Sequence, residues 1–303
     1  MLNFLKQEQI SPALLDGVRQ FRAAFPVSEE VSDRIASSAH FYYGKEVWEQ
    51  ALSALLCGKN LLLAGHKATG KNIFAENLAA LFGRPRWDIS FHVNTDAAAL
   101  IGTDTFSQGQ VVFRPGPVYC CAKYGGFGIL DEINMAKNEA MAVLHASLDH
   151  RRVVDVPGYD RIRLDPAARF VATMNYGYAG TKELNEALVS RFVVISMPMI
   201  SQDNLNRLLR QEFPGLTSKY ALQFSLLFTE LQEKCAHAEI SSRALDLRGL
   251  LDAVSLMTRG LNPYAALDMG ITNKSFDPFE QALIRDTIRA RIPKKADASV
   301  IFE

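Results

Sequence analysis

The stretch NLLLAGHKATGKN, residues 60–72, constrains the fold of this chain more than any other segment. An apolar run of strand character breaks at Gly65, and Gly70 and Lys71 follow at the spacing of a phosphate-binding loop. Such a loop joins a buried strand to the start of a helix, whose positive end faces a bound anion. The segment therefore predicts a strand, a loop and a helix arranged to bind nucleotide phosphates.

The loop matches the phosphate-binding pattern at every position but the last. We predict that all its residues contact the nucleotide: Gly65, His66, Lys67, Ala68, Thr69, Gly70, Lys71 and Asn72. Lys71 would bring a mobile charge to the outer phosphates. Asn72 stands where Ser or Thr normally lends a hydroxyl to magnesium, and its carbonyl oxygen is a ligand type that Mg²⁺ accepts. Taken alone, the loop also fits a tight strand-to-helix turn with an incidental lysine.

An acidic pair follows a second apolar run, FGILDEIN, residues 127–134. Parallel strands collect ligands at their carboxyl ends, so Asp131 and Glu132 are expected beside the phosphate loop. There Asp131 would hold the water shell of a magnesium ion, and Glu132 would orient and deprotonate an attacking water. We also expect a helix to begin directly after the pair. A strand with this ending favours a nucleotide site over two solvated carboxylates.

Two further polar residues follow apolar or helical segments. Asn175 ends the apolar run RFVATMN, and if that strand lies beside the phosphate-loop strand, its amide would contact the γ-phosphate or the attacking water. An Asn at a strand end is otherwise a common turn former. Arg191 ends the short helical segment ELNEALVSRF. It would be a charge favoured by the helix dipole, or a finger presented to the nucleotide of a neighbouring subunit.

The order of patterns along the chain predicts an α/β fold with three parts. Residues 1–45 read as an N-terminal helical segment, 46–200 as an α/β nucleotide-binding core with a parallel sheet between helices, and 201–303 as a helical lid domain. Two hairpin patterns interrupt the core, TFSQGQVVFRPG at 105–116 and RRVVDVPGYDRIRL at 151–164.

Bulk properties restrict the cell compartment and the partners. The 303 residues include 33 basic and 33 acidic side chains, so overall charge gives no attraction to nucleic acid or to an anionic membrane. The four cysteines form no CxxC pair, which is typical of reduced thiols. The longest apolar stretch is about half of a bilayer span. These observations predict a cytoplasmic protein without a membrane segment.

The ordered motifs GHKATGKN, GILDEIN, ATMN, GTKELNEALVSRF and SSRALDLRGLL resemble those of the MoxR branch of AAA+ ATPases, close to the group that includes CbbQ, NorQ and GvpN. The resemblance covers about residues 45–260 and implies ATP and Mg²⁺ as ligands. It implies the following roles: phosphate binding for Lys71, magnesium binding for Asp131, the catalytic base for Glu132, the first sensor for Asn175, a finger acting on the adjacent subunit for Arg191, and the second sensor for Arg243. Asn94 or His92 would restrain the glutamate. The two hairpins match insertions of that family.

The same resemblance implies a homo-oligomeric ring, a hexamer, that remodels or activates a partner complex. The usual co-worker carries a von Willebrand factor A domain, and the client protein is not identified. A nucleic-acid-linked, GTP-using motor is one alternative, opposed by the neutral charge and by NKSF at 273–276, which lacks the aspartate of a guanine-reading motif. The other alternative is a nucleotide-bound regulatory module with little hydrolysis, for which Asn72 is the only support.

Overall fold

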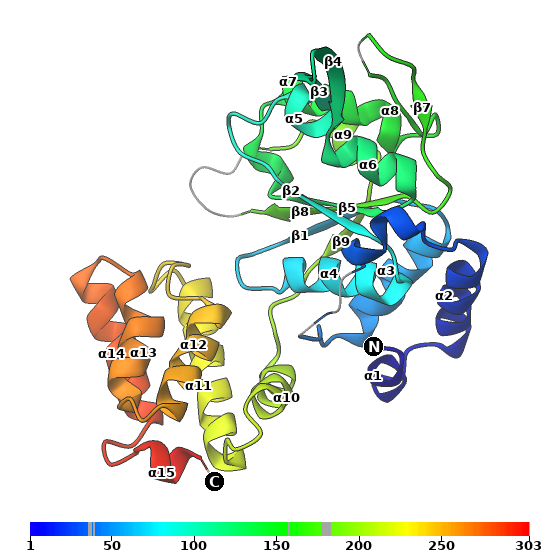
Figure 1. Cartoon of the computed structure of the whole chain (residues 1–303). Helices are drawn as coiled ribbons and strands as arrows, with labels where there is room; N and C mark the ends of the chain where they lie inside the picture. The colour runs from blue at the N-terminus through cyan, green and yellow to red at the C-terminus, as the bar shows by residue number, and fades with distance from the viewer. Residues whose placement is uncertain (36–37, 39, 157, 177–182, 303) are drawn as a thin grey trace. The chain divides into compact units, whose positions relative to one another are not determined.

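The computed structural model describes residues 1–35, 38, 40–156, 158–176 and 183–302. They form two compact units, one made of residues 1–66 and 70–197 and the other of 67–69 and 198–303. The first is an α/β unit and the second is helical (Figure 1). Both classes agree with the predicted fold.

A five-stranded, all-parallel sheet forms the centre of the first unit. In spatial order its strands are β2 (Arg86–Ser90), β5 (Phe127–Asp131), β8 (Arg169–Asn175), β1 (Leu61–Gly65) and β9 (Val193–Ser196). All five residues of β1 are buried, as a strand covered on both faces requires. Strand β8 therefore separates β1 from β5, and the carboxyl ends of these three strands are neighbours.

Helices cover both faces of this sheet. In Figure 1, α4 (Lys71–Phe82) lies below the sheet and α6 (Pro117–Tyr124) above it. Helix α4 begins at the lysine of the phosphate loop, and α3 (Lys45–Leu56) precedes β1. Beyond α3, Gly58 adopts a left-handed φ of 75°, a conformation that glycine commonly takes just after a helix. The sheet and its helices thus fix the start of α4 beside the ends of β1 and β8.

Shorter elements complete the first unit. The N-terminal residues form α1 (Leu2–Gln7), α2 (Pro12–Ala24) and the 3-10 helix η1 (Glu29–Arg34), with α2 packed on α3 and α4. Others are α5 (Ala97–Ile101), η2 (Ile133–Met135), α7 (Asn138–Met141), η3 (Ala142–Leu144), α8 (His145–Leu148) and α9 (Glu186–Val189). The helix predicted directly after Glu132 begins as the 3-10 helix η2, and the α-helix α7 starts at Asn138.

Both predicted hairpins are present. The first pairs β3 (Gly102–Ser107) with β4 (Gln110–Pro115), and the second pairs β6 (Val153–Val154) with β7 (Ile162–Arg163). Pro157, which the sequence places in the turn of the second hairpin, lies outside the described residues.

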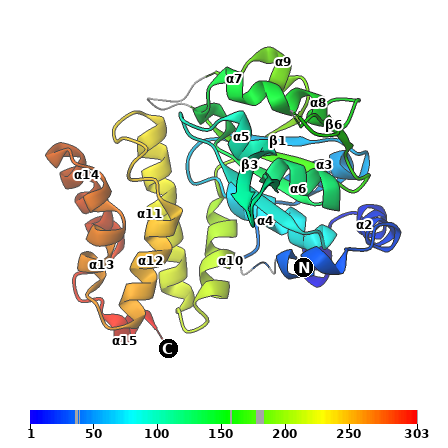
Figure 2. The same ribbon diagram turned by 45° about the horizontal axis from the view of Figure 1, so that its top comes forward.

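The second unit consists of helices α10 (Gln202–Glu212), α11 (Ser218–Ala236), α12 (Leu247–Thr258), α13 (Pro263–Gly270), η4 (Thr272–Lys274), α14 (Pro278–Arg291) and α15 (Ala298–Ile301). Figure 2 shows the longer ones packed side by side. Helices α12 and α13 approach so closely that a Cβ on Gly249 would lie 1.9 Å from the carbonyl oxygen of Gly270. In the described part of the chain, no helix combines the length and the apolar character that a membrane crossing needs.

Candidate active site

The phosphate loop encloses its lysine. Lys71 Nζ donates hydrogen bonds to the carbonyl oxygens of Gly65 at 3.0 Å and His66 at 2.6 Å, and the side chain is buried. Ala68 and Gly70 have left-handed φ values of 65° and 77°. Left-handed residues turn successive backbone N–H groups toward one point, as in anion-binding nests. The loop therefore has the backbone shape and the cation that bound phosphate requires.

Burial lowers the pKa of Lys71 to about 8, although the nearby carboxylates of Asp131 and Glu132 act in the opposite direction. A lysine with this pKa loses part of its charge within the range of ordinary assay buffers. Because the folded pKa lies below the unfolded one, the unfolded chain binds more protons between these two values. The stability of the ligand-free protein should therefore rise as the pH increases from about 8 to 10.

The same shift predicts pH-dependent nucleotide binding. A phosphate anion favours the charged lysine, so binding takes up a proton when the pH is above 8. Since only about a tenth of the lysines are charged at pH 9, ATP affinity should be roughly tenfold lower there than at pH 7. Calorimetry at both pH values checks this, and Lys71→Arg, whose guanidinium does not titrate, should abolish the dependence. Equal wild-type affinities at pH 7 and pH 9 would contradict it.

The acidic pair lies at the end of β5, next to β8. Asp131 Oδ1 accepts a hydrogen bond from Thr173 Oγ1 at 2.6 Å, and Asp131 Oδ2 accepts one from Asn72 Nδ2 at 2.9 Å. Glu132 has a left-handed φ of 53°, a conformation that costs a residue with a side chain about 1 kcal/mol. Its backbone N–H donates to Thr173 Oγ1 at 3.0 Å. Strand β8 therefore holds both acidic residues.

Asn175, the predicted sensor, contacts the predicted catalytic base. Asn175 Nδ2 donates to Glu132 Oε1 at 3.2 Å, and the Asn175 carbonyl accepts a bond from Asn134 Nδ2 at 2.9 Å. The sequence had offered Asn94 or His92 as the residue restraining Glu132. In the structure the Asn94 backbone N–H donates to His92 Nδ1 at 3.2 Å instead. The amide bonded to the carboxylate of Glu132 comes from β8, because β8 is the neighbour of β5.

The amide of Asn72 is oriented toward the acidic pair. As assigned, its nitrogen donates to Asp131, so this amide supports the carboxylate in the position where a hydroxyl normally reaches magnesium. Rotation of the amide by half a turn would present its oxygen instead. Asn72 is thus brought together with Asp131, and its role as a magnesium ligand stays a prediction.

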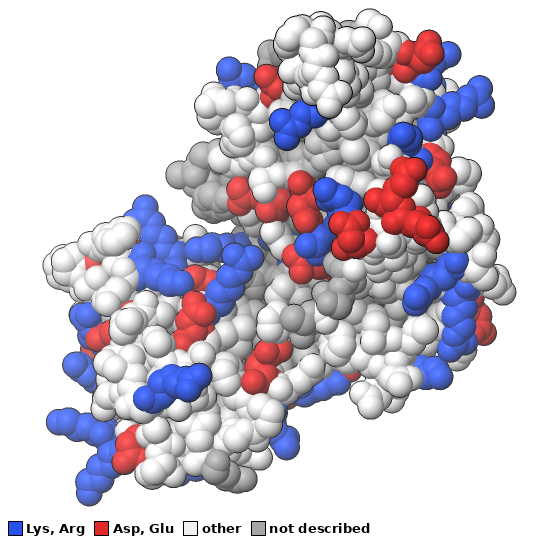
Figure 3. Space-filling view, viewed as in Figure 1, with Lys and Arg blue, Asp and Glu red and all other residues white. Residues whose placement is uncertain are grey.

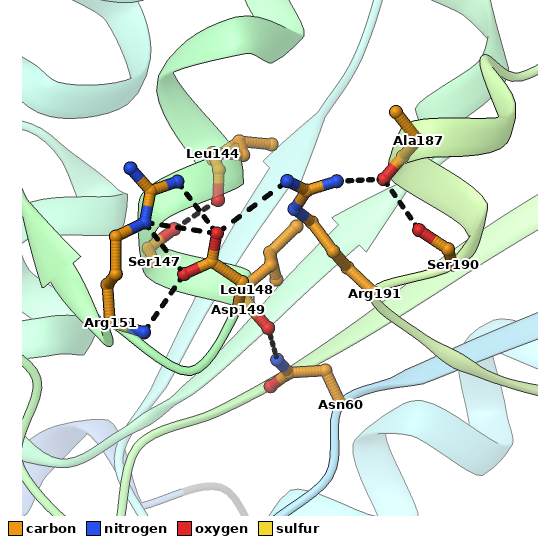
Figure 4. Close-up of polar contacts among 9 residues, drawn as sticks. All are labelled: Asn60, Leu144, Ser147, Leu148, Asp149, Arg151, Ala187, Ser190 and Arg191. Atoms are coloured by element: carbon orange, nitrogen blue, oxygen red, sulfur yellow. Dashed lines mark hydrogen bonds and ion pairs between the residues drawn. The ribbon is translucent and has the colours of Figure 1, made fainter.

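Arg191 takes part in a hydrogen-bond network within its own chain (Figure 4). Its Nη1 donates to the Ala187 carbonyl, and its Nη2 lies 3.6 Å from Asp149 Oδ2. Among the described residues, Arg191 Nε is buried without a hydrogen-bond partner. The guanidinium is therefore only partly satisfied by its own chain.

Asp149 is shared between two arginines. It accepts hydrogen bonds from Arg151 Nη2 at 2.7 Å and from the Arg151 backbone N–H at 3.0 Å, on the side opposite Arg191 (Figure 4). The Arg151 side chain lowers the pKa of Asp149 to about 2, so this carboxylate is ionised at neutral pH. The end of α8 that carries it is tied to the sheet, because Asn60 Nδ2 donates to the Leu148 carbonyl at 3.2 Å.

Arg243 belongs to the helical unit, where its guanidinium lies 6.0 Å from the ring centre of Phe276. Its role as the second sensor stays a prediction. Sequence analysis missed Thr173 and Asp149. Thr173 is a buried polar residue within the otherwise apolar run FVATM, which was a readable signal, whereas nothing in the sequence around Asp149 distinguished it from a solvated carboxylate.

The parallel sheet has a phosphate loop after β1, an acidic pair at the end of β5 and a polar residue at the end of β8, which lies between these two strands. This arrangement defines an AAA+ P-loop NTPase fold. Residues 60–192 match the family model of the AAA domain, dynein-related subfamily, and the chain belongs to this family.

Bacterial relatives match most of the chain. It is 34% identical over 266 residues to Uncharacterized protein YojN of Bacillus subtilis (strain 168), covering 86% of this chain and 87% of that protein. It is 32% identical over 262 residues to Uncharacterized protein SSP1341 of Staphylococcus saprophyticus, covering 84% and 98%. Among solved structures, a mutant of Thermotoga maritima RuvB matches with a TM-score of 0.47 and 14% identity, covering 86% of this chain and 73% of that one.

Proposed function

We propose that this chain is an ATP-hydrolysing AAA+ protein of the MoxR type, which assembles into a ring and remodels or activates a partner protein complex. One observation carries the proposal: the acidic pair and Asn175 lie at adjoining strand ends of one parallel sheet, and Lys71 begins α4 directly after the loop that follows β1. Strands β1 and β8 are paired up to Gly65 and Asn175, and β8 also pairs with β5. Phosphate-binding and water-activating groups are therefore within reach of one triphosphate.

Each of these residues has a distinct role in hydrolysis. Lys71 binds the outer phosphates and neutralises their charge. Glu132 accepts a proton from the attacking water as the bond from oxygen to the γ-phosphorus forms and the bond to the ADP oxygen breaks. Asn175 holds the Glu132 carboxylate by its amide, and that amide is also placed to contact the γ-phosphate. Glu132 is therefore released from the Asn175 amide before it accepts a proton, and the attacking water replaces that amide as its hydrogen-bond partner.

The donor set at the end of β5 fits a magnesium ion. Asp131 supplies a carboxylate, and Asn72, 2.9 Å away, supplies an amide that can present oxygen. When bound, the ion would neutralise charge on the β- and γ-phosphates. Asp131 would hold its water shell, and Asn72 would act as a ligand or as a donor to Asp131.

Ring assembly follows from the proposed finger. Arg191 acts in trans only if subunits meet head to tail, and such a contact repeats until a ring, here a hexamer, closes. The side chain of Arg191 is 22% exposed and its ion pair with Asp149 is 3.6 Å long, which supports this role because a phosphate oxygen can compete with Asp149 for the guanidinium.

The hairpin β3–β4 is the part of the first unit that we propose contacts a client. Phe106 and Val111 face each other across the hairpin and are 78% and 64% exposed. Exposed apolar surface of this kind is typical of a protein interaction site. Tyr159 near the second hairpin donates to Asp104 Oδ1 at 2.7 Å, so the hairpins are connected and would move together. A protein with a von Willebrand factor A domain is the proposed co-worker, and the client stays unidentified.

Surface charge gives little support to a nucleic-acid motor. On the face of the first unit drawn in Figure 3, basic side chains lie among acidic ones. Such mixing weakens the attraction for a phosphate backbone.

The proposed function is tested by measuring phosphate release per chain against protein concentration. A ring with a site completed in trans predicts a rate per chain that rises with concentration and then saturates, for ATP in preference to GTP. A rate independent of concentration would contradict the shared site. Absence of hydrolysis at every concentration would favour the regulatory module, and stimulation by DNA or RNA would favour the motor.

A further inference from the structure

Thr173 is a buried hydroxyl in the central strand of the sheet. It lies in β8, whose first five residues are all buried and whose other members up to that point are apolar except for Arg169. The side chain of Thr173 is 1% exposed. A hydroxyl in such a place requires hydrogen-bond partners, because leaving it unpaired would be unfavourable.

Both of its partners belong to the acidic pair. Thr173 Oγ1 donates to Asp131 Oδ1 at 2.6 Å and accepts the backbone N–H of Glu132 at 3.0 Å. A hydroxyl has a single proton to donate, so Thr173 donates its one hydrogen bond to Asp131. One side chain thereby links the proposed magnesium-binding carboxylate to the backbone of the proposed base.

The bond to Glu132 is made where the backbone leaves the strand. Glu132 has φ 53° and ψ 45°, the left-handed region that side-chain-bearing residues seldom adopt. This turn directs the Glu132 carboxylate to Asn175, whose amide donates to it at 3.2 Å. Thr173 and Asn175 are two residues apart on β8 and so point to the same face of the sheet. Thr173 holds the backbone of Glu132, and Asn175 holds its carboxylate.

We propose that Thr173 is a positioning residue of the hydrolysis site, which sets the distance between Asp131 and Glu132 through a single hydroxyl. The inference rests on the proposed function. The Thr173 hydroxyl is bonded to the acidic pair, so its loss should affect turnover and leave ATP binding through the phosphate loop almost unchanged.

The test compares Thr173→Val, which keeps the shape and removes the hydroxyl, with Thr173→Ser, which keeps the hydroxyl. Since small displacements of catalytic groups cost up to about 100-fold, we expect Thr173→Val to lower kcat by about 10- to 100-fold. The Kd for a slowly hydrolysed ATP analogue should stay within about threefold of wild type, and Thr173→Ser should retain at least about a third of wild-type kcat.

Thr287→Val is the matched control. Thr287 is also a buried threonine, but it lies in α14 and its hydroxyl donates to the Leu283 carbonyl. Loss of this hydroxyl should change stability without changing kcat. Thermal unfolding of each variant establishes that it is folded. If Thr173→Val does not fold, Thr173→Cys, whose thiol is a weaker donor, should lower kcat with unchanged Kd.

The inference is overturned if folded Thr173→Val, or Thr173→Cys in its place, turns over at the wild-type rate. It is equally overturned if folded Thr173→Ser is as inactive as Thr173→Val, since a restored hydroxyl would then not matter. Either result, with wild type active and Glu132→Gln inactive, leaves the proposed function intact. Wild-type protein without hydrolysis at any concentration would instead mean that the proposed function itself is wrong.

Discussion

Replacing Glu132 with glutamine is expected to lower ATP hydrolysis by about 10²- to 10⁴-fold, the contribution of a positioned general base. Glutamine has nearly the same size and keeps an oxygen that can accept the Asn175 amide hydrogen bond. It cannot take a proton from water at neutral pH. The variant should therefore bind ATP with nearly unchanged affinity and fail only in the chemical step.

Phosphate release and calorimetry with Mg-ATP separate these two effects. Glu186→Gln serves as the matched control, since Glu186 is an exposed carboxylate in the first turn of α9. It should hydrolyse ATP at the wild-type rate. If Glu132→Gln kept more than about a tenth of wild-type turnover, Glu132 would not be the base and the role of the acidic pair would have to be reassigned.

Replacing Arg191 with alanine is expected to lower turnover by about 10³-fold, the typical contribution of a finger to the phosphoryl-transfer transition state. The guanidinium is 22% exposed and has only a loose 3.6 Å ion pair with Asp149, so a phosphate oxygen of a neighbouring subunit's nucleotide can compete for it. Steady-state phosphate release at a saturating protein concentration measures the loss.

Arg151→Ala is the control for this experiment. Arg151 shares Asp149 with Arg191, but its side chain is 52% exposed and donates three hydrogen bonds of 2.7–3.2 Å to the carboxylate. Its removal changes the same cluster and leaves the proposed finger in place, so turnover should stay within about threefold of wild type. Equal losses in the two variants would show that the cluster is structural.

Mixing inactive variants tests whether Arg191 acts in trans. A Lys71→Ala chain has an intact Arg191, and an Arg191→Ala chain has an intact phosphate loop. If subunits meet head to tail, random mixing of equal amounts should give an intact phosphate loop and an intact finger at about a quarter of the subunit interfaces. Turnover should then become measurable. Unimpaired hydrolysis by Arg191→Ala alone would contradict the finger assignment.

Much of the fold was predictable because its signals are local. Strands β1, β5 and β8 were predicted as apolar runs, and the start of α4 was predicted at Lys71, because a glycine-rich turn precedes it. The carboxyl-end rule for parallel strands then placed Asp131 and Asn175 at one edge. The region after Glu132 was less predictable. Its left-handed turn leads into the 3-10 helix η2, and the sequence pattern predicted a helix there without distinguishing the 3-10 form from the α form.

The contacts within the site were not predictable in the same way. Asn72 and Asp131 are 59 positions apart, and the sequence could say which atoms each residue carries but not that the amide nitrogen faces the carboxylate. The same is true of Asp149 and Arg191. Their ion pair depends on how α8 and α9 lie beside each other, which no local pattern records.

The sequence by itself determined that this chain has a phosphate loop and an acidic pair at the ends of parallel strands, because strand burial and turn chemistry depend on residues close together in the chain. Only the tertiary structure decided which side chains hold those groups. The strand order places β8 between β1 and β5, and hydrogen bonds form between neighbours in space, so Thr173 and Asn175 are the residues that hold Glu132.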